Sequence, residues 1–585
     1  VVHNVTSMIL YEQTFLSAND FFLCCFNPII MVTYLIVGLK FRGKKMNKIK
    51  NNCYLLFSMA ILSFLYSLPL FYNQDLRAFN NQDLLFHLTR SLGMNNVLSS
   101  PVNFLNYANH GTMANTFYPW VFLFPLFVLY KVSGSIVIGY KLFFLLVTFV
   151  TMIIAYFSVY SIVKNKNSAF LFSVLYSFSL YRTTDLYYRS SFGEVIAMSF
   201  LPLVILGFYQ VVFNDYKKWY WLTLSVSALL YTHLLSAAVM VIMLLIAFIC
   251  SIYGMNELRH RLQALVLSGI LFVFIALGFI VPFVIRTHQN VLSVPPLFKL
   301  QGTNLGDLFI FSLNNTIGMN SIGITTIVAL VITIIYYTKN RATLSKFKRL
   351  MFYSAIVVLI LSSSLFPWSI FNGTPIAQIQ FVWRLNAFST VMILMAFSII
   401  VLPNTNLSKR MILSIVGFIV LFNFSSLNTL YNDPQKVFTS LSTSKRTNVM
   451  VAGYYHSDYS PEIARDHKEQ LSQPLDMVNK HVESKVRISP STYQISIKNL
   501  EKHSKRITIP VYYYKNQIVK LNGSTVKSNE SSIGTTIIKI PSGKSNVAIS
   551  YKYYTIEKIS FVISIFTTIL LIAYMIKPKN HKLMH

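Results

Sequence analysis

The most constraining feature of the sequence is a series of apolar runs, many of them as long as a lipid bilayer is thick. About 20 consecutive apolar residues span a bilayer as a helix. Such runs predict a polytopic α-helical membrane protein of about 12 or 13 spans. The candidate spans are residues 21–39, 53–72, 136–162, 169–181, 195–213, 219–231, 234–253, 262–285, 322–337, 350–366, 385–402, 411–427 and 559–576.

Composition and charge agree with a membrane protein and argue against nucleic-acid binding. Only 12% of residues are charged, against about 25% in soluble domains. The net charge is +31, but the basic residues gather in short loops between apolar runs, the pattern typical of cytoplasmic loops. These loops are residues 40–50, 164–166, 217–218, 259–261, 339–349, 409–410 and 577–582. The cysteines lie in or beside apolar runs, so no disulfide framework is predicted.

The basic loops assign the remaining connections to the opposite, extracytoplasmic side. These external segments are residues 73–116, 182–194, 286–321, 367–384 and 428–558. The apolar segment 117–130 is too short for a comfortable span, and a full span there would move 164–166 outside. We therefore interpret 117–130 as a re-entrant or surface-lying hairpin.

Four regions follow from this reading. Residues 1–45 are either an upstream extension before Met46 or contain a true first span at 21–39. Residues 46–427 form the transmembrane domain, with 73–116 as its first external loop. Residues 428–558 form an extracytoplasmic β-rich domain, and 559–585 are the final span and a cytoplasmic tail.

The β-rich prediction rests on alternation and turns in the second half of 428–558. Apolar and polar residues alternate over 486–489, 493–497 and 507–511, as in half-buried strands. Asn522-Gly523 lies between two short apolar stretches and favours a tight hairpin. The pattern predicts a small β-sandwich-like module held at both ends by membrane spans.

Acidic residues are scarce before the β-rich domain. Residues 1–430 hold nine of them, and the predicted topology places five outside. A general base on the external face is therefore sought among a short set: Asp75, Asp83, Asp185, Glu194 and Asp307.

Six arginines lie on the same external face, against the trend of the basic loops. The guanidinium group grips phosphate through a planar fork of donors, so these arginines suggest a phosphate-bearing ligand. Interface anchoring, or pairing with the external acids, is the alternative reading. The six are Arg77, Arg90, Arg182, Arg189, Arg286 and Arg384.

Asp83, His87 and Arg90 are spaced so that they share one face if their loop is helical. An acid, an imidazole and a guanidinium can form a base with its orienting partners. A solvated helix face with a local ion pair is the competing interpretation. Two ligands make a poor metal site, so no cofactor is assigned and a divalent metal stays open. His233 is expected to be a hydrogen-bonded histidine at a helix break.

Several short stretches together carry a family resemblance: residues 83–90, 118–119 with 125–126, 189–194, 231–233 and 380–384. They resemble YfhO-like bacterial membrane proteins and the family labelled "6-pyruvoyl-tetrahydropterin synthase-related, membrane domain". Both look like members of the GT-C glycosyltransferase superfamily. Val382 stands where the family commonly has proline, and Asp458-Tyr459-Ser460-Pro461 is similar to a Tyr-x-Pro motif there.

The resemblance implies a transferase of the bacterial plasma membrane. Its donor is a sugar on a polyprenyl phosphate, and its acceptor is a cell-envelope polymer or lipid, reached with inversion on the extracytoplasmic face. The acid of the first external loop maps onto Asp83, with His87, Glu194 and Asp75 as supporting residues. Arg384, with Arg90 or Arg189, is expected to bind the donor phosphate.

Two other classes stay open: a lipid-linked sugar transporter or flippase, and a non-catalytic envelope assembly protein. The chain carries no P-loop, GxGxxG, GxSxG or HExxH motif, so ATP-driven transport and cytosolic hydrolase chemistry lose support.

Overall fold

The computed structural model describes residues 46–79, 82–295, 297–455, 458–473, 475, 479 and 481–576. The predicted span 21–39, and with it the whole of 1–45, lies outside these residues. Every other predicted span is helical.

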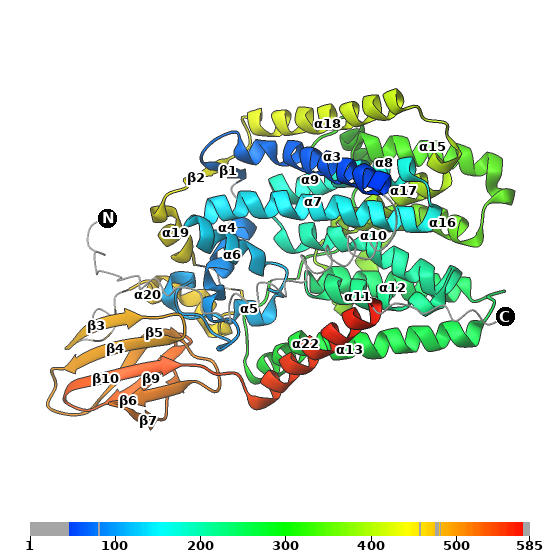
Figure 1. Cartoon of the computed structure of the whole chain (residues 1–585). Helices are drawn as coiled ribbons and strands as arrows, with labels where there is room; N and C mark the ends of the chain where they lie inside the picture. The colour runs from blue at the N-terminus through cyan, green and yellow to red at the C-terminus, as the bar shows by residue number, and fades with distance from the viewer. Residues whose placement is uncertain are drawn as a thin grey trace.

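Long apolar helices run side by side through most of the molecule (Figure 1). In the described part of the chain, eight helices are long and apolar enough to cross a membrane, judged by length and composition. They are α3 (Met46–Phe71), α7 (Ile136–Val163), α10 (Phe192–Phe213), α12 (Leu234–Ser251), α13 (Leu258–Gln289), α17 (Leu385–Ile400) with its flanking turns, α18 (Lys409–Asn432) and α22 (Thr555–Ile576). The remaining predicted spans are shorter helices: α8 (Lys166–Ser177), α11 (Tyr220–Leu230), α15 (Ile324–Asn340) and α16 (Lys346–Ser362).

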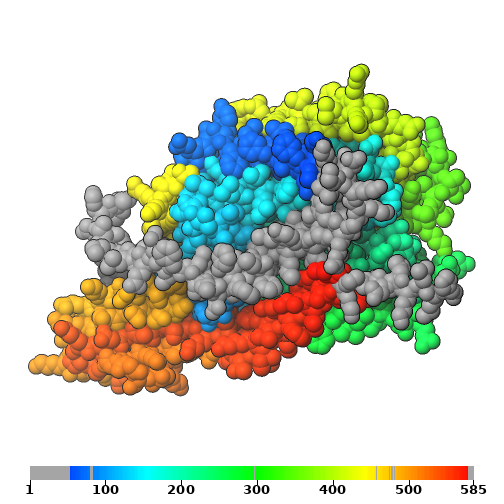
Figure 2. All heavy atoms as spheres, in the orientation of Figure 1, coloured from blue at the N-terminus to red at the C-terminus, as the bar shows by residue number. Residues whose placement is uncertain are grey.

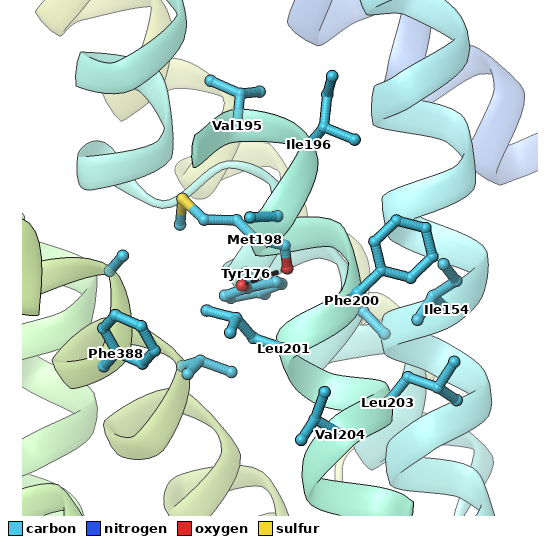
Figure 3. Close-up of a cluster of buried hydrophobic side chains, with 14 of the residues drawn as sticks. Ile154, Tyr176, Val195, Ile196, Met198, Phe200, Leu201, Leu203, Val204 and Phe388 are labelled. Atoms are coloured by element: carbon cyan, nitrogen blue, oxygen red, sulfur yellow. Dashed lines mark hydrogen bonds between the residues drawn. The ribbon is translucent and has the colours of Figure 1, made fainter. Parts of the chain in front are cut away.

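The centre of the helical body is built around α10. This helix is apolar on all sides, and 94% of its most apolar window is buried, as expected for a helix enclosed by others. Gly207 permits the close packing of α11, because a Cβ there would lie 2.6 Å from the Leu222 Cα. Figure 3 shows the surrounding core, where the Tyr176 hydroxyl donates to the Met198 carbonyl at 2.6 Å. A buried tyrosine hydroxyl needs such a hydrogen-bond partner, because an unpaired buried polar group is destabilising.

The connections that the charge pattern grouped together also lie together in space. Near the basic loops, Arg261 Nη2 donates to the Asn214 carbonyl at 3.2 Å, just before residues 217–218, and Lys346 Nζ donates to the Gly254 carbonyl at 2.9 Å, just before residues 259–261. The predicted external segments meet one another through separate contacts. Phe104 N donates to the Pro490 carbonyl at 3.0 Å, Tyr512 N to the His110 carbonyl at 2.8 Å and Ser293 N to the Ser460 carbonyl at 2.8 Å.

The segment 117–130 does not form one long helix. It contains the end of α5 (Ala114–Phe117), a bend, and most of α6 (Phe124–Ser133). Ten helical residues rise only about 15 Å, half of a bilayer core. A helix of this length does not cross a bilayer core alone, and the re-entrant or surface-lying hairpin stays a prediction.

The C-terminal β-rich module consists of two antiparallel sheets that share one apolar core. The hairpin at Asn522-Gly523 forms as predicted, with φ of 50° and 89° at the two residues. One sheet has the order β3 (Val482–Ile488), β4 (Thr492–Asn499), β10 (Gly543–Ser550), β6 (Ile518–Leu521), β7 (Ser524–Val526), and the other β5 (Lys505–Tyr512), β9 (Thr535–Ile540), β8 (Asn529–Glu530). In Figure 2 the module projects from one end of the helical body, and α22 continues from it along the surface beside α13.

Short elements connect the helical body to the module. β1 (Leu76–Phe79) pairs antiparallel with β2 (Phe438–Leu441). This contact joins the first external loop to the segment after α18, and the sequence did not predict it.

The remaining α-helices are short: α4 (Gln82–Leu92), α9 (Leu180–Thr183), α14 (Leu305–Leu313), α19 (Lys445–Ala452) and α20 (Lys468–Leu471).

Candidate active site

A network of ion pairs lies where two predicted external segments meet. Glu194 is its centre: one carboxylate oxygen pairs with Arg189 Nη1, and the other lies 3.2 Å from Arg384 Nε. Arg189 Nη1 also pairs with Asp185, which is fully buried. Arg384 is nearly two hundred residues from Glu194 in sequence, so tertiary structure alone brings the two together.

The local chain conformation presents Glu194 to both arginines. Ser190 adopts a positive φ of 54°, which turns the chain from residues 184–188 into α10. Glu194 then occupies the first turn of α10, where the helix dipole favours an anion. Gly193 leaves room for a neighbour, because a Cβ there would lie 2.2 Å from the Tyr118 hydroxyl.

Arg384 is the more accessible of the two arginines. Its side chain is 18% exposed, against 7% for Arg189. Nη1 donates to the Ile379 carbonyl at 3.0 Å and to Gln380 Oε1 at 2.9 Å. Among the described residues, Nη2 has no hydrogen-bond partner. A cation at the start of a helix opposes the dipole, and Arg384 immediately precedes α17, so Glu194 offsets an otherwise unfavourable position.

Aromatic rings line one side of the network. The Arg189 guanidinium lies 4.1 Å from the centre of the Trp383 ring. Trp383 stacks on Phe381 at 5.1 Å, and Phe381 stacks on Phe298 at 4.7 Å. These three stacked rings extend from the segment after α13 to the arginines.

Asp83, on the first turn of α4, interacts electrostatically with Arg189, Glu194 and Arg384. The residue has an exposed surface, yet loss of solvation to the surrounding protein raises the pKa of its carboxyl, against the opposing effect of Arg189. A raised pKa brings a carboxylate closer to the range useful for a general base near neutral pH. The structure therefore groups four predicted site residues: Asp83, Arg189, Glu194 and Arg384.

His87 and Arg90 share α4 with Asp83, as the spacing predicted, but both are buried in packing contacts. The His87 ring stacks on Phe192 at 4.7 Å. Arg90 donates to the carbonyls of Tyr118 and Pro119 at 3.2 and 3.0 Å. These contacts favour structural roles for both residues.

Asp75 lies on the β1–β2 ribbon, where it accepts a hydrogen bond from Ser440 at 3.2 Å. Among the described residues, Asp75 and Arg77 form no ion pair with each other. Arg77 instead donates to the Tyr431 carbonyl at 2.9 Å and lies over the Phe438 ring at 4.7 Å. The unpredicted pairing of β1 with β2 supplies these alternative partners.

His233 is a hydrogen-bonded histidine at the break between α11 and α12, as predicted. Its Nδ1 caps α12, accepting from Ser236 N at 3.3 Å. Burial lowers the pKa of His233 to about 4, and the nearby Glu194 raises it only in part. His233 is therefore neutral at pH 7.

Two residues near the site had no role assigned from the sequence. Trp383 supports Arg189, and Asp458 interacts electrostatically with Asp83. Both fall in stretches that the resemblance had singled out. Within the described part of the chain, no three His, Cys, Asp or Glu side chains converge as metal ligands, and the divalent metal stays a prediction.

Residues 116–431, more than half of the 585-residue chain, match the family described as a 6-pyruvoyl-tetrahydropterin synthase related domain of membrane proteins. The chain belongs to this family. The family resemblance predicted from the sequence is therefore confirmed. The matched range contains Arg189, Glu194 and Arg384, whereas Asp83 and Asp458 lie outside it.

No curated protein matches the chain. Among solved structures, the arabinofuranosyltransferase AftD from Mycobacteria has 13% identity and a TM-score of 0.40, covering 64% of this chain and 26% of its own. The oligosaccharyltransferase AglB from Archaeoglobus fulgidus, in complex with an inhibitory peptide and a dolichol-phosphate, has 11% identity and a TM-score of 0.31, covering 72% and 58%. This chain thus spans less than two thirds of either relative, and both TM-scores lie below 0.5.

Proposed function

We propose that this protein is an inverting membrane glycosyltransferase that moves a sugar from a polyprenyl phosphate to a hydroxyl of a cell-envelope polymer or lipid. One observation carries the proposal. An accessible arginine, Arg384, and a second one, Arg189, share one glutamate beside an exposed acid, Asp83, at the end of the helices that adjoins the β-rich module.

The proposed step uses the two sides of this site differently. The acceptor oxygen attacks the anomeric carbon, the bond from that carbon to the phosphate oxygen breaks, and its electron pair leaves with the polyprenyl phosphate. Asp83 takes the proton of the acceptor hydroxyl. Arg384, through Nη2, and Arg189 stabilise the charge that develops on the leaving phosphate.

A lipid-linked donor fits the surroundings of Arg384. Its guanidinium matches phosphate geometry, and the rings of Phe298, Phe381 and Trp383 provide apolar surface next to it. In this proposal residues 46–427 form the transferase domain, and 428–558 help to bind the acceptor on the extracytoplasmic face of a bacterial plasma membrane.

Purified protein in lipid vesicles, supplied with a labelled polyprenyl-phosphate sugar and an oligosaccharide acceptor, tests the function. Covalent transfer of label to the acceptor is expected. Movement of the intact lipid across the vesicle without transfer would instead indicate a transporter, and neither result would indicate an assembly protein.

The side of the membrane is tested separately by labelling single cysteines in a cysteine-free background. Asn522, in the β6–β7 turn, and Ser345, before α16, are both exposed, so accessibility alone does not distinguish them. An impermeant thiol reagent applied to whole cells is expected to label Asn522→Cys and not Ser345→Cys. Equal labelling would contradict the orientation.

A further inference from the structure

We propose that Asp458 is a second acid of the site and binds the acceptor beside Asp83, so that the acceptor is a polyhydroxyl sugar in which two hydroxyl groups are held together. This inference rests on the proposed function. It gives a role to the one motif, Asp458-Tyr459-Ser460-Pro461, that the site had not used.

Backbone hydrogen bonds fix the loop that carries Asp458. Tyr459 N donates to the Ser293 carbonyl at 2.9 Å, Ser293 N to the Ser460 carbonyl at 2.8 Å and Glu462 N to the Val291 carbonyl at 3.1 Å. The Tyr514 hydroxyl of the β module donates to the Tyr459 carbonyl at 3.0 Å. The loop is therefore held by both the segment after α13 and the β module.

The residue next to Asp458 has an unusual backbone conformation. Tyr459 has a φ of 65°, a left-handed value that is uncommon for a residue with a bulky side chain and persists only when its surroundings hold it. Its ring stacks on Phe117 at 5.5 Å and lies 6.4 Å from Phe86. Phe86 is one turn from Asp83 on α4, so these contacts place the loop against the helix that carries the proposed base.

The charges of the two acids interact directly. Asp458 is partly buried, and loss of solvation, together with a smaller effect of the Asp83 carboxylate, raises its pKa to about 6. The other titratable groups that face Asp458 are Tyr107, Tyr454 and Tyr459. Because the charge of Asp83 raises the pKa of Asp458, an ionised Asp83 favours the protonated form of Asp458.

Two acids whose charges interact suit a sugar better than a simple alcohol. One hydroxyl gives its proton to Asp83 as it attacks, and a neighbouring hydroxyl hydrogen-bonds to Asp458. Hydrogen bonds to charged groups are the stronger kind, so loss of this contact should weaken acceptor binding more than it slows the chemical step.

Asp458→Asn should raise the KM for an oligosaccharide acceptor by about 10- to 100-fold, with a smaller change in kcat. The acidic limb of the kcat/KM profile should also move to lower pH, because the ionisation near pH 6 is removed. Asp466→Asn is the matched control, since Asp466 lies in the same segment with a side chain that is 74% exposed. A wild-type KM and pH profile for Asp458→Asn would overturn the inference while leaving the transferase proposal intact.

Carbodiimide labelling, read by mass spectrometry, tests the pair without any turnover. Carbodiimides react with protonated carboxyl groups, so Asp458 should label at pH 6 in the wild type, less in Asp83→Asn, and less again with acceptor sugar present. If no transfer is seen with any donor but these labelling changes occur, the proposed function fails and the paired site stands. Labelling of Asp458 that ignores both Asp83→Asn and the acceptor sugar contradicts the inference.

Discussion

Two arginine–glutamate groups in this protein differ in how completely they are closed. Arg286 and Glu557 form a bidentate pair, with distances of 2.9 and 2.7 Å, and both side chains are 0% exposed. The Arg286 guanidinium also lies 4.6 Å from the Tyr554 ring. In the Glu194 group, one carboxylate oxygen pairs with Arg189 and the other with Arg384. The Arg384 side chain is 18% exposed.

The difference separates a structural pair from the proposed binding site. The Arg286–Glu557 pair joins α13 to α22 and so fixes the last helix, from which the β module extends. It has no access for a ligand. The Glu194 network is accessible through Arg384, and Asp83 adds an acid beside it. Burial of ions is costly unless they are well paired, which suits the closed Arg286–Glu557 pair to a structural role, whereas the partly exposed Arg384 can still contact a ligand.

The largest expected effect comes from the proposed base. Asp83→Asn should lower the rate of sugar transfer by about 10²–10⁴-fold, the usual contribution of a general base. The substitution is nearly isosteric and at an exposed residue, so the protein should insert and fold normally. Initial rates with a labelled donor provide the measurement.

Asp75→Asn is the control for that experiment, because Asp75 lies in the same external loop and its side chain accepts a hydrogen bond from Ser440 of β2. It should keep most of its activity. If Asp75→Asn is inactive and Asp83→Asn is not, the base is Asp75. If both are active, the transferase reading of this loop fails.

Breaking the buried Arg286–Glu557 pair should lower the stability of the protein rather than the rate of sugar transfer. Arg286→Ala leaves Glu557 buried without its partner and should destabilise the protein by about 3–5 kcal/mol, measured as a lower Tm in detergent. The double variant Arg286→Met with Glu557→Leu removes both charges and should recover most of that loss. Equal Tm values for the single variant and the wild type would show that the pair is not a clamp.

Replacing the accessible Arg384 should slow sugar transfer with little loss of stability. Arg384→Lys keeps the charge but loses the planar fork, and Arg384→Ala also loses the charge. Removing one such stabilising group typically costs about 10²–10³-fold in kcat, so both variants should insert normally and transfer slowly. Full activity in Arg384→Ala would remove Arg384 from the site.

The smallest effect is expected at the glycine that shapes the network. Gly193→Ala would place a Cβ 2.2 Å from the Tyr118 hydroxyl, and overpacking of this kind costs about 1–3 kcal/mol. Gly269→Ala in α13 is the matched control, since nothing lies within 4 Å of its Cβ position. A Tm for Gly193→Ala as high as that of Gly269→Ala would show that Tyr118 can move aside.

Some features follow from the sequence because they depend on local patterns. Apolar runs of bilayer length and the Asn522-Gly523 turn each act over a few residues, and the predicted spans that fall within the described residues are helical. The resemblance likewise pointed to short stretches, and the family membership is confirmed. The helical spacing of Asp83, His87 and Arg90 was also correct.

The spacing could not decide which of those side chains is exposed to solvent and which is buried by packing. Arg90 and Arg384 are both arginines on the predicted external side of the membrane. Arg90 is buried and donates to the carbonyls of Tyr118 and Pro119, whereas Arg384 is accessible. Likewise, only the folded chain brings Asp83, Glu194, Arg384 and Asp458 within electrostatic range of one another. Burial and long-range charge contact depend on the packing of whole helices, and no local pattern of residues encodes them.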